Sequence, residues 1–511
     1  MAEKVKQYRL PDDPITLDEL KSFLWAAATH LRGQIDAAGY KEYIFPLLFF
    51  KRISDVYDEQ FEGFVCEGGV EYAGMQVEDL PIRIPDGAHW RDVREVTENV
   101  GNKLVEAFIA IEQANPAKEM DGRKIGGLEG IFGPKDGWTN KAKMPDNIIT
   151  SLIEDFSKYT LSLKVCPADE MGQAYEYLVG KFADDAGNTA QEFYTNRTVV
   201  QLMAEILQPQ PNESIYDPTC GSGSLLIKAG REVGNNNFSL FGQEANGSTW
   251  ALAVMNMYLH GYDNAIIRWG DTLRNPKHKE GDKLMLFDTV VANPPFSLDK
   301  WGAEELENDS YNRFWRGMPP KSKGDWAFIS HMIESLNAHG KAGVVVPHGV
   351  LFRGAAEGRI RTEILNEDIL EAVVGLPSNL FFGTGIPAAI IIFNREKKNK
   401  EKVLFIDASK DFVAGKNQNS LGENHINHIV EVFTDFHDNQ KDAGILEDKF
   451  AYIATLEEIK ENDYNLNIPR YVDTYEEEAE IDLAEVQQKI AQLQTELADV
   501  QKQMDEYLKL F

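Results

Sequence analysis

The sequence has few cysteines and no long apolar run. Its 511 residues include three cysteines, Cys66, Cys166 and Cys220, and no two of them stand in the CxxC spacing of a zinc site. Their odd number and wide separation argue against a disulfide framework and favour a reducing compartment. The first residues lack the apolar core of a signal peptide, and apolar stretches such as residues 43–50 are much shorter than the ~20 residues that span a bilayer. We therefore expect a cytoplasmic protein without a metal site or a membrane role.

Positive charge is also scarce. The chain has 52 basic and 82 acidic residues, which gives a formal net charge of -30 at pH 7. A protein that binds DNA tightly by itself needs clustered lysine and arginine side chains to neutralise the phosphates. The composition therefore argues against autonomous DNA binding. It leaves room for a local basic patch, or for a partner that makes most of the DNA contacts.

The first part of the chain has the periodicity of helices. Thr16 and Glu19 form a capping-box pattern, and apolar residues follow at helical spacing. Further helical stretches, separated by loops with glycine and proline, continue to about residue 165. We predict a mainly helical domain over residues 1–165, and its sequence does not indicate its function.

Short β-rich runs alternate with helical stretches from about residue 214. The runs read SIYD, SLFGQE, AIIRWGD, DTVVANPP, AGVVVP, ILEAVVGLP and AAIIIFN. Such alternation predicts an α/β domain, here over residues 166–473, with an open, largely parallel sheet that helices cover on both faces. Ligands of such sheets bind beyond the carboxyl ends of the strands, so the residues that end these runs are the candidates for a site.

The last segment, residues 474–511, has apolar residues at alternating spacings of three and four. They are Leu483, Val486, Ile490, Leu493, Leu497, Val500, Met504, Tyr507 and Phe511. This is the heptad pattern of a coiled coil, and it predicts a C-terminal helix that docks onto a partner helix. The alternative is a terminal helix that packs on its own domain.

A glycine-rich turn follows the run SIYD, with Asp217 at the strand end and then Gly221, Ser222 and Gly223. Glycines let a ligand approach the backbone and leave N–H groups free to bind it. The dinucleotide fingerprint would need glycine where Leu226 stands, and the Gly-Lys-Ser/Thr of a P-loop is absent. A pyrophosphate ligand is therefore disfavoured.

Carboxylates end three successive strands of the predicted sheet, at Asp217, Glu244 and Asp271. An acidic residue after the second strand is the expected ligand of a ribose hydroxyl in a Rossmann-like site. Each carboxylate taken singly could instead cap a helix. Together they suit a ligand with a ribose and an amine but no phosphate.

The run DTVVA leads directly into Asn293, Pro294, Pro295 and Phe296. Two consecutive prolines fix the backbone and remove two N–H donors, so that carbonyl groups can face a ligand. Asn293 adds an amide oxygen, and Phe296 adds a ring on which a planar base could stack. The alternative is an ordinary loop with a core phenylalanine.

These two motifs carry a family resemblance. Asp-Pro-x-x-Gly-Ser-Gly at residues 217–223, followed by Asn-Pro-Pro-Phe at residues 293–296, resembles the gamma class of amino-methyltransferases that act on DNA. Over almost its whole length, including the helical front and residues 191–196, the chain resembles the modification subunit of type I restriction-modification systems. The resemblance implies a Rossmann-like methyltransferase domain that transfers a methyl group from S-adenosylmethionine to N6 of adenine in duplex DNA.

The resemblance also implies roles for individual residues. S-adenosylmethionine would be held by the strand-end residues named above and by a preceding segment, Gln191, Glu192, Phe193, Tyr194, Thr195 and Asn196. Asn293 and Pro294 would hold the adenine amine, and Phe296 would stack on the flipped base. The family commonly has proline where this chain has Asn196, which can still cap the following helix. The implied partners are double-stranded DNA, a specificity subunit and a second modification subunit, to which a restriction subunit can be added.

Three other interpretations remain open at this stage. The amine acceptors would also suit a methyltransferase that acts on protein glutamine or on RNA, or N4 of cytosine in DNA. A catalytically silent assembly subunit is a further alternative. Residues 298–325 carry mixed charges and are expected to form a solvated loop, or one that orders over DNA.

Overall fold

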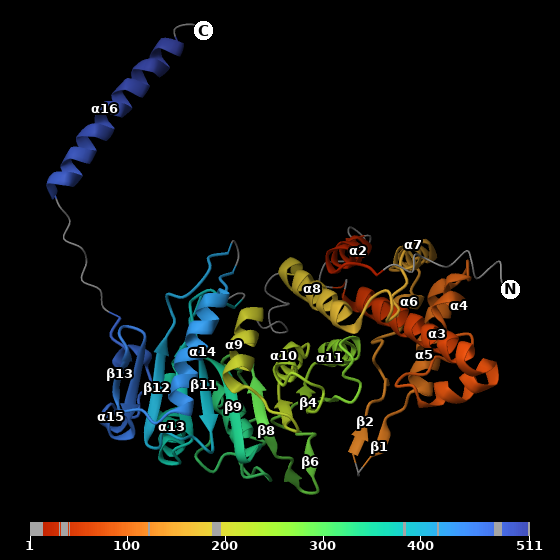
Figure 1. Cartoon of the computed structure of the whole chain (residues 1–511), viewed down its shortest axis with the longest axis horizontal. Helices are drawn as coiled ribbons and strands as arrows, with labels where there is room; N and C mark the ends of the chain where they lie inside the picture. Colours follow the sequence, from red (N-terminus) through yellow and green to blue (C-terminus); the bar gives the residue numbers. More distant parts are fainter. Residues whose placement is uncertain are drawn as a thin grey trace. The chain divides into compact units, whose positions relative to one another are not determined.

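The computed structural model describes residues 14–29, 31, 39, 41–120, 123–186, 196–381, 385–415, 418–474 and 483–508. The chain forms two compact units, residues 1–472 and 473–511, and each is described by itself (Figure 1). The boundary near residue 165, between a helical and a catalytic domain, stays a prediction, because both segments lie in the first unit.

A ten-stranded sheet forms the centre of the first unit, with the order β13-β14-β12-β10-β11-β9-β8-β3-β4-β5. Its strands are β3 (Ser214–Asp217), β4 (Ser239–Glu244), β5 (Ile266–Trp269), β8 (Phe287–Ala292), β9 (Leu336–Pro347), β10 (Leu370–Gly375), β11 (Ala388–Asn394), β12 (Lys402–Asp407), β13 (Gly444–Glu447) and β14 (Ala451–Thr455). The α/β fold class is thereby confirmed.

The sheet is more mixed than the sequence predicts. Strands β5, β4, β3, β8 and β9 are parallel, whereas β11 is antiparallel to both β9 and β10. Every residue of β11 is buried, so its sequence has no alternation of polar and apolar residues from which its pairing could be inferred. The parallel half carries all the predicted strand-end residues.

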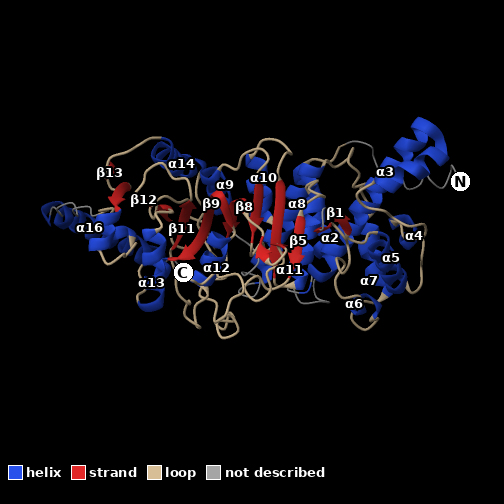
Figure 2. Cartoon of the chain, turned by 90° about the horizontal axis from the view of Figure 1, so that it is seen from below, coloured by secondary structure: helices blue, strands red, loops and turns tan. Residues whose placement is uncertain are grey.

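Helices cover both faces of the sheet (Figure 2). One face packs against α9 (Arg197–Leu207), α10 (Ser224–Glu232), α11 (Gly247–Leu259) and α14 (Glu423–Asp438), and the other against α12 (Asp325–Glu334), α13 (Ala355–Asn366) and α15 (Leu456–Glu461). Neighbouring strand residues alternate between the two cores: Ile215 belongs to the first and Tyr216 to the second.

The N-terminal part of the first unit is helical, as predicted. It contains α2 (Leu17–Thr29), α3 (Lys41–Gln76), α4 (Trp90–Arg94), α5 (Val100–Ala114), α6 (Asp136–Thr139) and α7 (Asp146–Phe156), with one small hairpin of β1 (Lys118–Met120) and β2 (Arg123–Ile125); α8 (Ala168–Ala186) follows. The capping box at α2 is present, since the Glu19 carboxylate accepts a hydrogen bond from the Thr16 N–H at 3.0 Å. The core of these helices continues into that of the sheet: the rings of Phe49 and Tyr258 lie 6.1 Å apart.

The second unit contains α16 (Leu483–Leu508), so the prediction of a C-terminal helix is confirmed over these residues. Phe511 lies outside the described residues. Five apolar side chains of the heptad pattern are at least half exposed: Ile490, Leu493, Leu497, Val500 and Met504. No helix in the described residues is long and apolar enough to cross a bilayer. The described part of the chain also contains no cluster of His, Cys, Asp and Glu side chains that could hold a metal ion.

Candidate active site

The candidate site lies at the carboxyl ends of the parallel strands. Strand β3 pairs with β4 on one side and with β8 on the other, so the strand order reverses at β3. Open α/β sheets bind their ligands at such a switch point. The glycine-rich turn follows β3 and the Asn-Pro-Pro-Phe segment follows β8, and adjacent strands therefore bring the two motifs together.

The backbone conformation of the turn explains why two of its residues are glycines. Gly221 and Gly223 have φ values of 54° and 82°, in the left-handed region that glycine adopts without strain. A Cβ atom on Gly223 would lie 2.7 Å from the methyl carbon of Met257. The Gly221 N–H donates to a Glu244 carboxylate oxygen at 3.0 Å, which ties the turn to the end of β4. Ser222 is buried, and its hydroxyl lies 3.2 Å from that of Ser224.

The three strand-end carboxylates have different surroundings. Asp217 is buried, and it accepts a hydrogen bond from the Thr219 N–H at 2.8 Å. Glu244 is half-buried and accepts from the Asn246 N–H at 2.8 Å. Asp271 accepts from two backbone N–H groups of its own loop and pairs with Arg274 at 2.9 Å. The bonds of Asp271 are thus those of a local cap, whereas Glu244 bridges two strand ends.

Burial raises the pKa of Asp217 to about 8, with a smaller contribution from the nearby Glu244 carboxylate and against the hydrogen bonds from Thr219, which lower it. Because this pKa is higher in the folded than in the unfolded chain, the protonated carboxyl favours folding. Its contribution is complete below about pH 4, the ordinary pKa of an aspartate, and is lost progressively as the pH rises from there to about 8.

Asp217→Asn should remove this pH dependence. From pH 5 to 8 the free energy of unfolding of the variant should rise relative to the parent chain by about 1 kcal/mol per pH unit, as measured by denaturant titration. Asp288→Asn is the control, because hydrogen bonds to Ser214 and Asn337 lower the pKa of Asp288, so its contribution changes only at acid pH. A constant difference between Asp217→Asn and the parent from pH 5 to 8 would contradict the prediction.

The catalytic-loop candidates follow β8 without a break. Asn293 is half-buried, Pro294 is buried and Pro295 is exposed. Phe296 is half-buried, and its ring meets the ring of Phe381 edge-on, with centroids 5.6 Å apart and planes at 69°. The sequence gives no signal for Phe381, which reaches the site from the loop after β10.

Asn196 caps α9, as expected, since its side-chain oxygen accepts from the Thr198 N–H at 3.0 Å. Its amide nitrogen donates to the carbonyl oxygens of Leu380 at 2.9 Å and Asn419 at 3.1 Å. Asn196 therefore connects α9 to the loop that holds Phe381. The other five residues of the segment, Gln191, Glu192, Phe193, Tyr194 and Thr195, lie outside the described residues.

Part of residues 298–325 is not the solvated loop that the mixed charge predicts, although many residues of the segment are exposed. Trp301 and Phe314 are buried in a small core of their own. Arg313 is fully buried, pairs with Asp309 at 2.8 Å and donates to the carbonyl oxygen of Leu273 at 2.7 Å. The expectation of a solvated loop is wrong for this central part, because these carbonyls and rings replace the water that a guanidinium would otherwise need.

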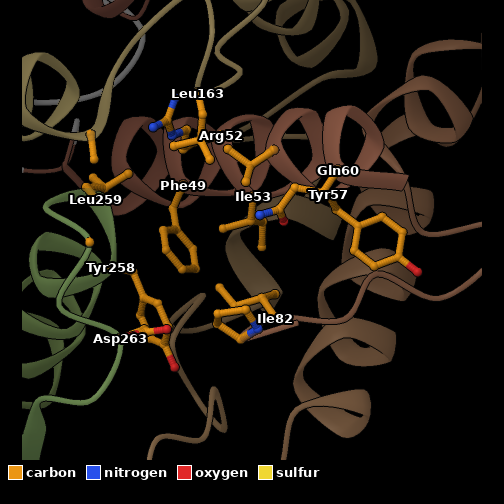
Figure 3. Close-up of a pocket in the computed structure, with 14 residues that line it drawn as sticks. Phe49, Arg52, Ile53, Tyr57, Gln60, Ile82, Leu163, Tyr258, Leu259 and Asp263 are labelled. Atoms are coloured by element: carbon orange, nitrogen blue, oxygen red, sulfur yellow. The ribbon is translucent and has the colours of Figure 1, made fainter. Parts of the chain in front are cut away.

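A separate cavity of about 180 Å³ lies between α3 and the C-terminal end of α11. Phe49 and Ile53 of α3 face Tyr258 and Leu259 across it (Figure 3). None of the predicted site residues lines this cavity, so the switch-point site is distinct from it.

Known protein families match both the helical N-terminal part of the chain and the part that contains the sheet. The N-6 DNA methylase family matches residues 167–480, and the HsdM N-terminal domain matches residues 20–156. The chain is 33% identical to the type I restriction enzyme MjaVIII methylase subunit of Methanocaldococcus jannaschii, over 97% of this chain and 85% of the relative. It is 34% identical to the HindI methylase subunit of Haemophilus influenzae, over 80% of this chain and 94% of the relative. A crystal structure of a type I restriction-modification methyltransferase subunit from Streptococcus thermophilus has a TM-score of 0.76 and 34% identity, covering 90% of this chain and all of that one.

Proposed function

The chain belongs to the N-6 DNA methylase family and to its type I restriction enzyme methylase subunits, and from this premise we propose a cytoplasmic DNA adenine methyltransferase that uses S-adenosylmethionine. It methylates N6 of adenine in duplex DNA as the modification subunit of a type I complex. One observation carries the proposal: the glycine-rich turn after β3 and the Asn-Pro-Pro-Phe loop after β8 lie on adjacent strands at the switch point of the sheet.

The residues present fit S-adenosylmethionine. Gly221 and Gly223 in this turn have left-handed backbone conformations, and because they carry no side chain a ligand can approach the backbone closely. We assign Glu244, at the end of β4, as the acceptor for the ribose hydroxyls. We assign Asp217, Asp271 and residues 191–196 to the same site on the family resemblance. When bound, this cofactor supplies an electrophilic methyl group.

The adenine amine is a weak nucleophile, because its lone pair is delocalised into the ring. In the proposed mechanism the Asn293 side-chain oxygen and the Pro294 carbonyl accept its hydrogens and orient the lone pair. Pro295 keeps this backbone rigid. Phe296 stacks on the base after it leaves the duplex, and the edge contact with Phe381 supports the ring. No strong base is needed, since the leaving group is neutral and the proton can depart afterwards.

Glu244→Ala should weaken binding of S-adenosylmethionine by about 10- to 100-fold, the usual cost of a charge-assisted hydrogen bond. Glu244→Gln should weaken it less, because an acceptor for the Gly221 N–H remains. Calorimetric titration of the purified chain measures both. Glu447→Ala, at the end of the distant strand β13, is the matched control. Unchanged affinity in Glu244→Ala would remove this residue from the site.

We further propose that target recognition comes from a separate specificity subunit, in a complex that contains two modification subunits and can add a restriction subunit. The net charge of -30 supports a partner that supplies much of the contact with DNA phosphates. The exposed apolar seam of α16 is the proposed docking element for that partner.

The test of the whole proposal is methyl transfer from labelled S-adenosylmethionine to unmethylated genomic DNA. The chain is assayed alone and then with the proteins that co-purify with it from its host. We expect N6-methyladenine only in the second case. Activity of the chain alone would contradict dependence on a partner, and label in protein or RNA would contradict the substrate.

A further inference from the structure

Few backbone donors are available to hold the catalytic loop. Pro294 and Pro295 have no N–H group, so the first backbone donors after them belong to Phe296 and Ser297. Ser297 has a φ of 52°, in the left-handed region that a residue other than glycine seldom adopts. Its conformation therefore needs support from the surrounding structure.

That support comes from Asp325, in the first turn of α12. One Asp325 carboxylate oxygen accepts from the Ser297 N–H at 2.7 Å, and the other lies 3.5 Å from the Ser297 hydroxyl. The Asp325 side chain is only 3% exposed. A buried carboxylate is costly unless it is paired and hydrogen-bonded, so a specific arrangement maintains it.

Arg353, between β9 and α13, completes this arrangement. Its guanidinium pairs with Asp325 at 3.0 Å and with Glu357 at 3.2 Å, and it lies 3.4 Å from the Ser297 hydroxyl. Ser297, Asp325, Arg353 and Glu357, which we call the anchor cluster, thus join three segments that are far apart in the sequence. All three segments meet where β8 and β9 end side by side.

We propose that Asp325 and Arg353 are positioning residues for methyl transfer, which hold the loop of Asn293 to Phe296 in the conformation that receives the adenine amine. The inference rests on the proposed function for its catalytic consequence. Neither side chain is required to touch the substrate. Both act through Ser297, the residue that directly follows the stacking ring of Phe296.

Hydrogen exchange tests the anchor without any assay of activity. Asp325→Ala should speed amide exchange at Phe296, Ser297 and Leu298, while helices remote from the cluster keep their protection. Asp325→Asn, which keeps an acceptor oxygen for the Ser297 N–H, should change it less. Unchanged exchange at these amides in Asp325→Ala would overturn the proposal, and this result would not depend on whether the chain methylates DNA.

Kinetics of the partner-containing complex test the catalytic consequence. Arg353→Met should lower kcat by about 100-fold, the effect of small misplacements of reacting groups, while KM for DNA and the affinity for S-adenosylmethionine stay within about twofold. Arg353→Lys should recover part of kcat. Arg316→Met is the matched control, because Arg316 is also buried and pairs with two glutamates, Glu334 and Glu367, but does not contact the loop.

The outcomes separate the two hypotheses. If the parent complex does not methylate DNA, the proposed function fails, and hydrogen exchange alone decides whether the anchor holds the loop. If the parent is active, a loss of kcat equal to that of Arg316→Met, or faster exchange with unchanged kcat, overturns the positioning role. A loss of kcat specific to the Arg353 and Asp325 variants, with partial recovery in Arg353→Lys, supports it.

Discussion

Asn293→Ala is expected to lower kcat for adenine methylation by at least about 100- to 1,000-fold, the effect of deleting one preorganised hydrogen-bonding group from an active site. The side chain of Asn293 follows β8 at the switch point, next to the turn that we assign to the cofactor. Alanine removes the acceptor for the amine but leaves the glycine turn and Glu244 in place. Affinity for S-adenosylmethionine should therefore stay within about twofold.

Single-turnover methylation and calorimetry of the same preparations test whether Asn293→Ala loses activity while it keeps its affinity for S-adenosylmethionine. Asn147→Ala, at an exposed position of α7 in the helical part of the chain, is the control and should change neither quantity. Equal loss of activity and cofactor affinity in Asn293→Ala would indicate misfolding instead of a missing acceptor. Activity close to that of the parent would exclude Asn293 from the reaction.

Phe296 offers a companion test of base stacking. Phe296→Tyr keeps the aromatic ring and should keep most of the activity, whereas Phe296→Ala should lower it because stacking no longer offsets the cost of base flipping. The edge contact with Phe381 is lost in Phe296→Ala as well. If both variants lost activity to the same extent, the result would point to a packing role for the ring.

The sequence predicts the parts of the site that depend on neighbouring residues. Asp217 ends β3, Gly221 and Gly223 follow within six residues, and the consecutive prolines at 294 and 295 come one residue after the end of β8. Such local patterns determine turns and strand ends, and the alternation of strands and helices then places them at one edge of the sheet.

Contacts between distant segments could not be predicted in this way. Asp325 lies 28 residues after Ser297, and Arg353 lies 28 residues after Asp325. Nothing in the sequence between them shows that these side chains meet. Arg313 is a similar case, because its burial depends on the carbonyl groups of Thr272 and Leu273, about 40 residues earlier. The charges in residues 298–325 therefore suggest side chains in contact with water. In the folded chain, backbone carbonyls and a carboxylate take the place of that water.

The largest expected effect on assembly comes from the seam of α16. Leu493 and Leu497 occupy successive heptad positions, and their side chains are 57% and 58% exposed. Burying a leucine side chain contributes about 1.5 to 3 kcal/mol, so a partner helix would gain several kcal/mol from these two residues. Replacing both with aspartate would remove this gain and place two charges in an apolar interface. We expect the specificity subunit to bind at least about 1,000-fold more weakly, or to dissociate.

Size-exclusion chromatography and ultracentrifugation of the purified complex measure this loss, and deletion of residues 483–511 should reproduce it. The control changes Gln492 and Thr495 to aspartate, which places the same two charges at the same level of the helix but away from the seam. Because the residues assigned to the cofactor belong to the other compact unit, calorimetry should show unchanged affinity for S-adenosylmethionine in both variants.

An intact complex with the double leucine variant would contradict docking through α16. Dissociation of the control as well would mean that aspartate destabilises the helix itself. Loss of the partner with the seam variant alone, together with loss of DNA methylation, would explain how a chain with a net charge of -30 acts on a polyanion: the partner brings it to the DNA.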